Sequence, residues 1–169
     1  MTRPWWLILA AMLLGSGCAG YRLGPTNGEV AGSKSIQIGL FQNQTFEPRL
    51  TEALGTALRR LVQQDGTYRL STHGDADIVV TGVITKYQRI GISFDPTDVI
   101  TPRDFQVLML AKVNATERST GRVLLDKEVG GRTTIRAGPD LTSAERQGVP
   151  VLAEDLARNI TSALVDGTW

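Results

Sequence analysis

The sequence contains one cysteine, Cys18, and one histidine, His73, in 169 residues. A single cysteine excludes an intrachain disulfide. A structural zinc site usually takes four ligands that are mostly Cys and His, so these two residues cannot build one. The chain also lacks the nucleophile elbow G-x-S-x-G and the P-loop pattern. The sequence therefore predicts a protein that is not an enzyme and that holds no metal or cofactor.

Closely spaced acids are also few. The nearest pairs are Asp75/Asp77 and Asp95/Asp98, and paired carboxylates can perform acid–base chemistry. These acids stand beside glycine and proline, where aspartate commonly shapes turns. An enzyme that uses either pair is therefore the least favoured hypothesis for the function. His73 is interpreted as an exposed loop residue.

The chain has almost no excess of charge. Its 18 basic and 17 acidic residues leave a net charge of +1, and removal of an N-terminal segment with Arg3 brings the net charge to zero. Binding to nucleic acid depends on a positive field. The composition therefore argues against nucleic acid as a partner.

Long hydrophobic runs are absent except for residues 5–14. This run follows Arg3 and is too short to span a bilayer, which takes about 20 residues in a helix. It is typical of a signal peptide that covers residues 1–17. The small residues that follow lead to Cys18, in a pattern similar to a lipobox, although Gly15 stands where leucine is usual. We expect cleavage before Cys18 and acylation of its thiol.

The alternative is an ordinary secretory signal with Cys18 as an incidental thiol, which would be reactive in an oxidising compartment.

Several acyl chains hold a protein stably on a membrane, whereas one does not. Ala19 follows the cysteine where an aspartate would indicate retention in the inner membrane. The prediction is an outer-membrane lipoprotein on the periplasmic face.

The remaining chain divides into a tether and one domain. Residues 18–33 are rich in glycine and turn-forming residues, which indicates a lipidated extended tether. Residues 34–169 have the length of one domain with its own core.

Hydrophobic periodicity predicts the elements of that domain. An apolar stripe at helical spacing predicts a helix over residues 47–64, with Thr45 as its N-cap and a stop at Asp65-Gly66. A second helix is expected over 143–165, kinked or restarted at Pro150. Alternating patterns predict strands, and a loop or long hairpin connection is expected over 91–103. The predicted strands cover 36–40, 78–90, 105–116 and 123–135, with a short extended piece at 68–70.

This order, β-α-β-β-β-α, predicts an α+β two-layer sandwich. About four mostly antiparallel strands would carry two helices on one face. The other face would expose Leu108 and Leu110, and such a surface can pair with another molecule. Gly130-Gly131 is interpreted as a bulge in the last strand, and a hairpin turn is expected at 119–121.

Basic residues recur near the predicted strand ends, at positions 86, 89, 103, 132 and 136. If they gathered at one end of the sheet, they would suit an anionic, phosphate-bearing ligand. The alternative is a solvated sheet end whose charges prevent pairing with other chains.

The mature chain resembles the LPS-assembly lipoprotein family, LptE. The residues that carry the resemblance are Cys-Ala-Gly-Tyr-Arg-Leu at 18–23, the segment 36–48 into the first helix, Ala-Asp-Ile-Val-Val-Thr-Gly at 76–82, and the Gly121 turn. The resemblance implies a non-catalytic protein that plugs the β-barrel LptD, helps this barrel assemble, and assists the delivery of lipopolysaccharide to the outer leaflet. Arg89 and Arg103 are the predicted lipopolysaccharide contacts. A generic envelope lipoprotein that binds another protein or glycan through its sheet is the alternative.

Overall fold

The computed structural model describes residues 30–95, 97–138 and 140–166. The predicted signal peptide, Cys18 and most of the tether lie outside the described residues. At the end of the tether, the backbone N–H of Gly32 donates to Thr67 O at 2.9 Å. In chain order the elements are β1 (Ser35–Asn43), α2 (Leu50–Asp65), β2 (Arg69–Leu70), β3 (Ile78–Asp95), β4 (Asp98–Glu117), β5 (Val123–Arg136) and α3 (Leu141–Val165).

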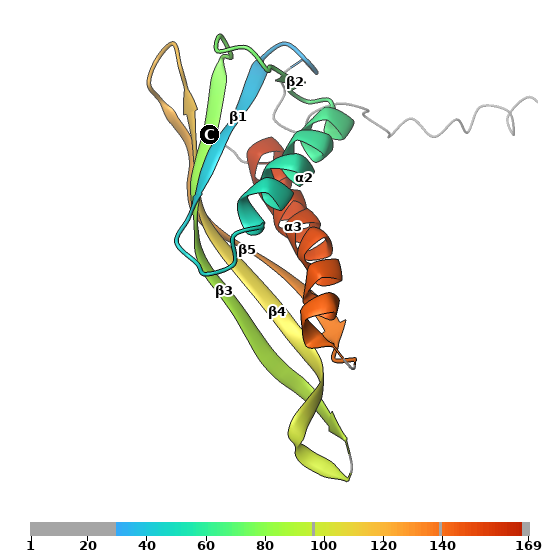
Figure 1. Cartoon of the computed structure of the whole chain (residues 1–169). Coiled ribbons are helices and arrows are strands. Elements are labelled where there is room, and N and C mark those ends of the chain that lie inside the picture. Colours follow the sequence, from blue (N-terminus) through green and yellow to red (C-terminus); the bar gives the residue numbers. More distant parts are fainter. Residues whose placement is uncertain (1–29, 96, 139, 167–169) are drawn as a thin grey trace, which may run out of the picture.

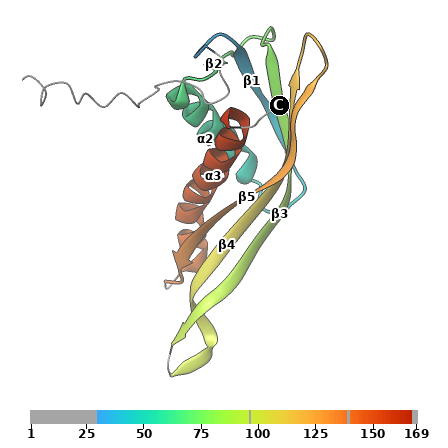
Figure 2. The same ribbon diagram turned by 180° about the vertical axis from the view of Figure 1, so that it is seen from behind.

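The strands form one five-stranded sheet in the order β2-β1-β3-β4-β5. Figures 1 and 2 show both helices on the same face of this curled sheet, which confirms the predicted α+β class. The sheet is mixed, because β1 runs parallel to β2 and β3 while β3, β4 and β5 are antiparallel. The chain crosses one face through α2 between β1 and β3, so it enters β3 in the direction of β1. The two-residue strand β2 accounts for the fifth strand.

Helix α2 begins later than predicted. Its N-cap is Arg49, with no side-chain cap hydrogen bond, whereas Thr45 belongs to the preceding loop and accepts from the Glu47 backbone N–H at 3.3 Å. The predicted stop is confirmed, since Gly66 has a φ of +75° and its N–H donates to Val62 O. Helix α3 also differs from prediction, because it is capped by Asp140 and continues through Pro150 without a new start.

The segment 91–103 is a long hairpin rather than a loop. β3 and β4 stay paired as far as Asp95 and Asp98, with register shifts near Gly91 and Ser93. These shifts accommodate the irregular pairing of Phe94 with Pro102, since proline cannot donate to the ladder. Figure 1 shows this arm extending beyond both helices.

The predicted bulge at Gly130-Gly131 is wrong. The pairing of β4 with β5 runs without a shift through these residues, and its irregularity lies at Ala115/Thr116. Gly131 instead allows close packing, because a Cβ there would lie 2.6 Å from the Leu156 Cβ on α3.

The core lies between the sheet and the helices. It includes Leu54 and Leu58 of α2, Leu156 and Ile160 of α3, and Met109 of β4, all fully buried. The opposite sheet face has no covering element among the described residues (Figure 2). There Leu108 and Leu110 are half-buried, and Leu40 is 80% exposed.

Candidate functional site

A cleft of about 610 Å³ lies where β3 passes the β1–α2 loop and the N-terminal part of α3. A register shift between Ile84 and Lys86 changes which β3 side chains face the helices. Ile84 is therefore buried before the shift, and Tyr87 packs against the core after it. The lining residues are Gln44, Thr45, Phe46, Glu47, Thr85, Lys86, Tyr87, Gln88, Arg89 and Glu145.

Arg89 and Glu145 form an ion pair across this cleft. The Arg89 Nη1 lies 2.6 Å from the Glu145 Oε1, and the side chains are 42% and 15% exposed. Although the atoms are close, the buried Glu145 Oε1 has no aligned hydrogen-bond donor. Arg89 therefore has a balancing charge but remains accessible from the cleft.

The rest of the lining supplies aromatic and charged groups. Burial raises the pKa of the Tyr87 hydroxyl, and the negative charges of Glu145 and Glu47 raise it further. Glu47 is held by Arg49, whose Nε donates to Glu47 Oε1 at 2.7 Å, and this hydrogen bond lowers the pKa of Glu47. Phe46 is fully exposed. Cations beside aromatic rings can bind a phosphorylated sugar through charge and ring stacking.

The structure divides the predicted basic cluster. Lys86 and Arg89 share the cleft, whereas Arg132 and Arg136 alternate with the buried Gly131 and Ile135 and so face the open side of β5. Arg136 pairs with Asp104 at 2.9 Å. Arg103 is exposed at the start of the arm, where its carbonyl accepts from the Ala137 N–H. The assignment of Arg89 and Arg103 to lipopolysaccharide contact stays a prediction.

Sequence reasoning missed Glu145, Tyr87 and Phe46. The alternation of Tyr87 with Arg89 was a usable signal, because it places both side chains on one side of β3. No local pattern shows that Glu145, more than fifty residues later, covers that side.

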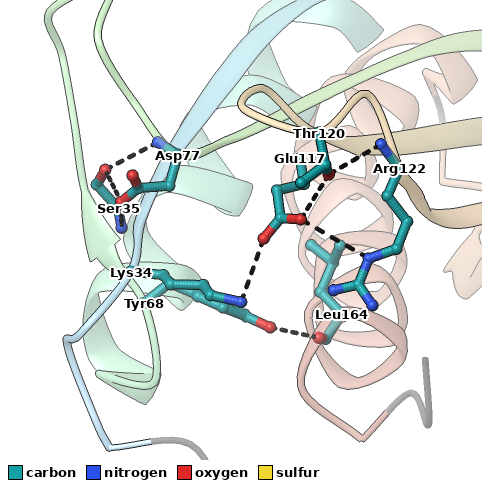
Figure 3. Close-up of polar contacts among 8 residues, drawn as sticks. All are labelled: Lys34, Ser35, Tyr68, Asp77, Glu117, Thr120, Arg122 and Leu164. Atoms are coloured by element: carbon teal, nitrogen blue, oxygen red, sulfur yellow. Dashed lines mark hydrogen bonds and ion pairs between the residues drawn. The ribbon is translucent and has the colours of Figure 1, made fainter.

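One acid of each predicted pair has a structural role. Asp77 accepts from both the backbone N–H and the hydroxyl of Ser35, each at 2.7 Å (Figure 3). These two hydrogen bonds, the backbone one first, lower the pKa of Asp77 and join the starts of β1 and β3. Asp98 accepts from the backbone N–H groups of Ile100 and Thr101, as expected for a turn residue.

The same end of the domain has a second polar network. Glu117 forms ion pairs with Lys34 at 3.4 Å and Arg122 at 3.7 Å (Figure 3). The Thr120 hydroxyl donates to Glu117 at 2.7 Å, and this hydrogen bond is the main reason that the pKa of Glu117 is lowered. The network ties the β4–β5 turn to the start of β1. Within the described ranges no three His, Cys, Asp or Glu side chains are grouped to hold a metal.

Most of the described chain matches one protein family. The model of the lipopolysaccharide-assembly family LptE matches residues 33–164. The chain belongs to the LptE family. This confirms the resemblance and assigns the protein to lipopolysaccharide assembly, a role that is not enzymatic.

Solved structures show the same fold in other bacterial proteins. The hypothetical protein CT253 from Chlamydia trachomatis has a TM-score of 0.59 at 9% identity, and covers 79% of this LptE-family chain and 97% of its own. A minor lipoprotein from Acinetobacter baumannii has a TM-score of 0.53 at 14% identity, with coverage of 79% and 93%. Lipoprotein B from Nitrosomonas europaea has a TM-score of 0.53 at 11% identity, with coverage of 86% and 90%.

No curated protein matches the sequence significantly. In the part of the chain that the structure describes, no helix has the length and apolar character needed to cross a membrane.

Proposed function

We propose that this LptE-family protein is a lipid-anchored outer-membrane component that occupies the lumen of an LptD-type β-barrel. It helps this barrel assemble and assists the delivery of lipopolysaccharide to the outer leaflet. The family match supports the process. The observation that carries the plug role is the open face of the sheet.

That open face mixes polar and apolar groups. Leu40, Thr81, Lys112 and Asp126 line a hollow of about 390 Å³ on it, and the half-buried Leu108 and Leu110 lie farther along β4. The lumen of a large barrel is polar, so a surface of balanced charge with scattered leucines suits it better than a lipid environment.

The anchor follows from Cys18. Acylation there holds the domain at the periplasmic face of the membrane, and the segment 19–30 can extend about 40 Å at 3.3–3.6 Å per residue. The intact mass of the mature N-terminus tests this anchor. An unmodified Cys18 thiol on a cleaved chain would overturn it.

The Arg89 cleft supplies an anion site for lipopolysaccharide. Arg89 is accessible beside Lys86 and two aromatic rings, and guanidinium groups bind phosphate in fixed geometry. Arg103 extends the basic contact toward the hairpin arm, where its side chain is exposed.

Site-specific photocrosslinking in intact cells tests the plug role. A crosslinker at Leu110 on the open face should trap a large outer-membrane barrel. A crosslinker at the exposed Gln63 of α2, on the helical layer, is the matched control and should trap less of it. The proposal fails if the protein extracts alone and its loss leaves surface lipopolysaccharide unchanged. A different protein or glycan trapped from Leu110 would favour the generic envelope lipoprotein.

A further inference from the structure

We infer that Glu145 is an internal competitor for the anion site. In the free protein the Glu145 carboxylate forms an ion pair with Arg89. A phosphate of the ligand must displace this carboxylate in order to bind Arg89. This inference rests on the proposed binding of lipopolysaccharide at the Arg89 cleft. The added element is Glu145, a residue that determines which anions can bind in the cleft.

The Arg89–Glu145 pair differs from ion pairs that fix the fold. At Arg136 and Arg49 the guanidinium Nε donates an aligned hydrogen bond to its carboxylate, at 2.9 Å and 2.7 Å. The Glu145 Oε1 approaches Arg89 as closely but accepts no aligned hydrogen bond, although it is buried. A buried acceptor without an aligned donor is destabilising relative to a satisfied one. The contact therefore compensates charge without securing the carboxylate.

A ligand can reach this pair without opening the core. The Arg89 side chain is 42% exposed and lines the cleft together with Lys86. In the free protein Glu145 offsets the charge of Arg89, while Glu47 is paired with Arg49, so the Arg89–Glu145 pair weakens the attraction of the cleft for anions. When Glu145 is displaced, Arg89 gains the new anion as its partner.

This exchange favours phosphate over carboxylate ligands. A phosphate monoester carries about −1.5 to −2 charge at neutral pH and three acceptor oxygens, so it gains more from Arg89 than Glu145 does. A singly charged carboxylate gains no more than the group it replaces. Glu145 thus acts as a specificity-determining residue that excludes weak anions.

Binding measurements on the mature lipidated protein in detergent test this role, with purified lipopolysaccharide as the probe and enzymatically dephosphorylated lipopolysaccharide as the comparison. We expect Glu145→Gln to bind lipopolysaccharide roughly fivefold more tightly, a modest effect because the pair is partly screened by solvent. The gain in affinity should be smaller for the dephosphorylated probe, which lacks the phosphate that Arg89 binds. Glu145→Ala carries the same expectation if the glutamine variant folds poorly.

Two further variants separate displacement from a general change of charge. Glu154→Gln removes the same charge from α3, about 13 Å farther along the helix at 1.5 Å per residue, where Glu154 pairs with Arg60. It should leave affinity unchanged, because this separation exceeds the screening length of about 10 Å at 0.1 M salt. Arg89→Gln should weaken binding, and adding Glu145→Gln to it should restore nothing, since the two residues act as a pair.

The outcomes distinguish the inference from the proposed function. If Arg89→Gln binds lipopolysaccharide as well as the unmodified protein does, the cleft is not the binding site. The proposed binding at the Arg89 cleft and the role of Glu145 are then both overturned. If Arg89→Gln weakens binding but Glu145→Gln does not tighten it, only the role of Glu145 is wrong. An equal gain from Glu154→Gln would likewise show a general charge effect and overturn the displacement.

Discussion

Replacing Gly131 with alanine should push helix α3 slightly away from the sheet and destabilise the fold. An added Cβ would lie 2.6 Å from both the backbone N and the Cβ of Leu156, and 2.8 Å from its Cα. Carbon atoms in contact prefer about 3.5–4.0 Å, so α3 would have to move away by about 1 Å. Backbone atoms cannot rotate aside as a side chain can, and overpacking of this kind costs about 1–3 kcal/mol.

A smaller stabilising effect on the unfolded chain opposes this cost. Gly131 is not among the glycines with a positive φ, so alanine can adopt its backbone conformation and stabilises by about 0.4–1 kcal/mol through the unfolded state. We expect a net loss of about 1.3 kcal/mol in the free energy of unfolding. With an m-value of about 2 kcal/mol/M, the midpoint of urea unfolding should fall by about 0.6 M.

The adjacent Gly130 is the matched control. A Cβ there would lie 3.0 Å from the Leu110 Cδ2, the end of a flexible side chain on the open face, and at an ordinary contact distance of 3.9 Å from the Met109 O. Gly130→Ala should therefore change stability by less than about 0.5 kcal/mol. The reasoning is refuted if both variants unfold at the same urea concentration with the same m-value.

Three further variants test the fold. The lowered pKa of Asp77 means that its carboxylate stabilises the fold above the unfolded pKa of about 3.9 and loses this effect as pH falls through the folded pKa. The melting temperature should therefore drop below about pH 4, and less steeply in Asp77→Asn; an identical slope in that variant would contradict this role. The Tyr68 hydroxyl donates to Leu164 O at 3.1 Å near the end of α3 (Figure 3). Tyr68→Phe should therefore lower the free energy of unfolding by about 1 kcal/mol in urea titrations. An unchanged value would show that water replaces this hydrogen bond. Gly66 has a φ of +75° with no atom within 4 Å of an added Cβ, so Gly66→Ala should cost about 1 kcal/mol through backbone strain alone, and an unaffected thermal melt would argue against that strain.

The elements with strong periodicity could be predicted. The apolar stripe of α2 and the alternation in β4 depend on which side of an element is buried, and this information is local. The extended piece at 68–70 was predicted, but its pairing with β1 as a fifth strand was not, because two residues at Arg69–Leu70 carry no period that assigns them to a sheet. The sequence left a loop and a long hairpin open for residues 91–103, since Pro102 and the aspartates near the tip are also typical of a loop, and the structure shows the hairpin.

The glycines and arginines show the same limit for the candidate site. The sequence marked Gly131 as unusual, but only the approach of Leu156 explains it. It also marked Arg89 and Arg136 as one basic group, whereas the structure gives them different acidic partners, Glu145 and Asp104. A strand pattern states which side a residue faces and not which later element covers that side.

The sequence by itself determined that the chain has no intrachain disulfide, that it lacks the usual catalytic motifs, and that two helices are combined with several strands. These properties depend on composition or on periods of two and 3.6 residues, so they can be read locally. Tertiary structure alone decided that Glu145 meets Arg89 and that Ser35 holds Asp77. An ion pair or hydrogen bond requires atoms within about 4 Å. The packing of α3 brings Glu145 this close to Arg89, and the parallel pairing of β1 with β3 brings Ser35 this close to Asp77.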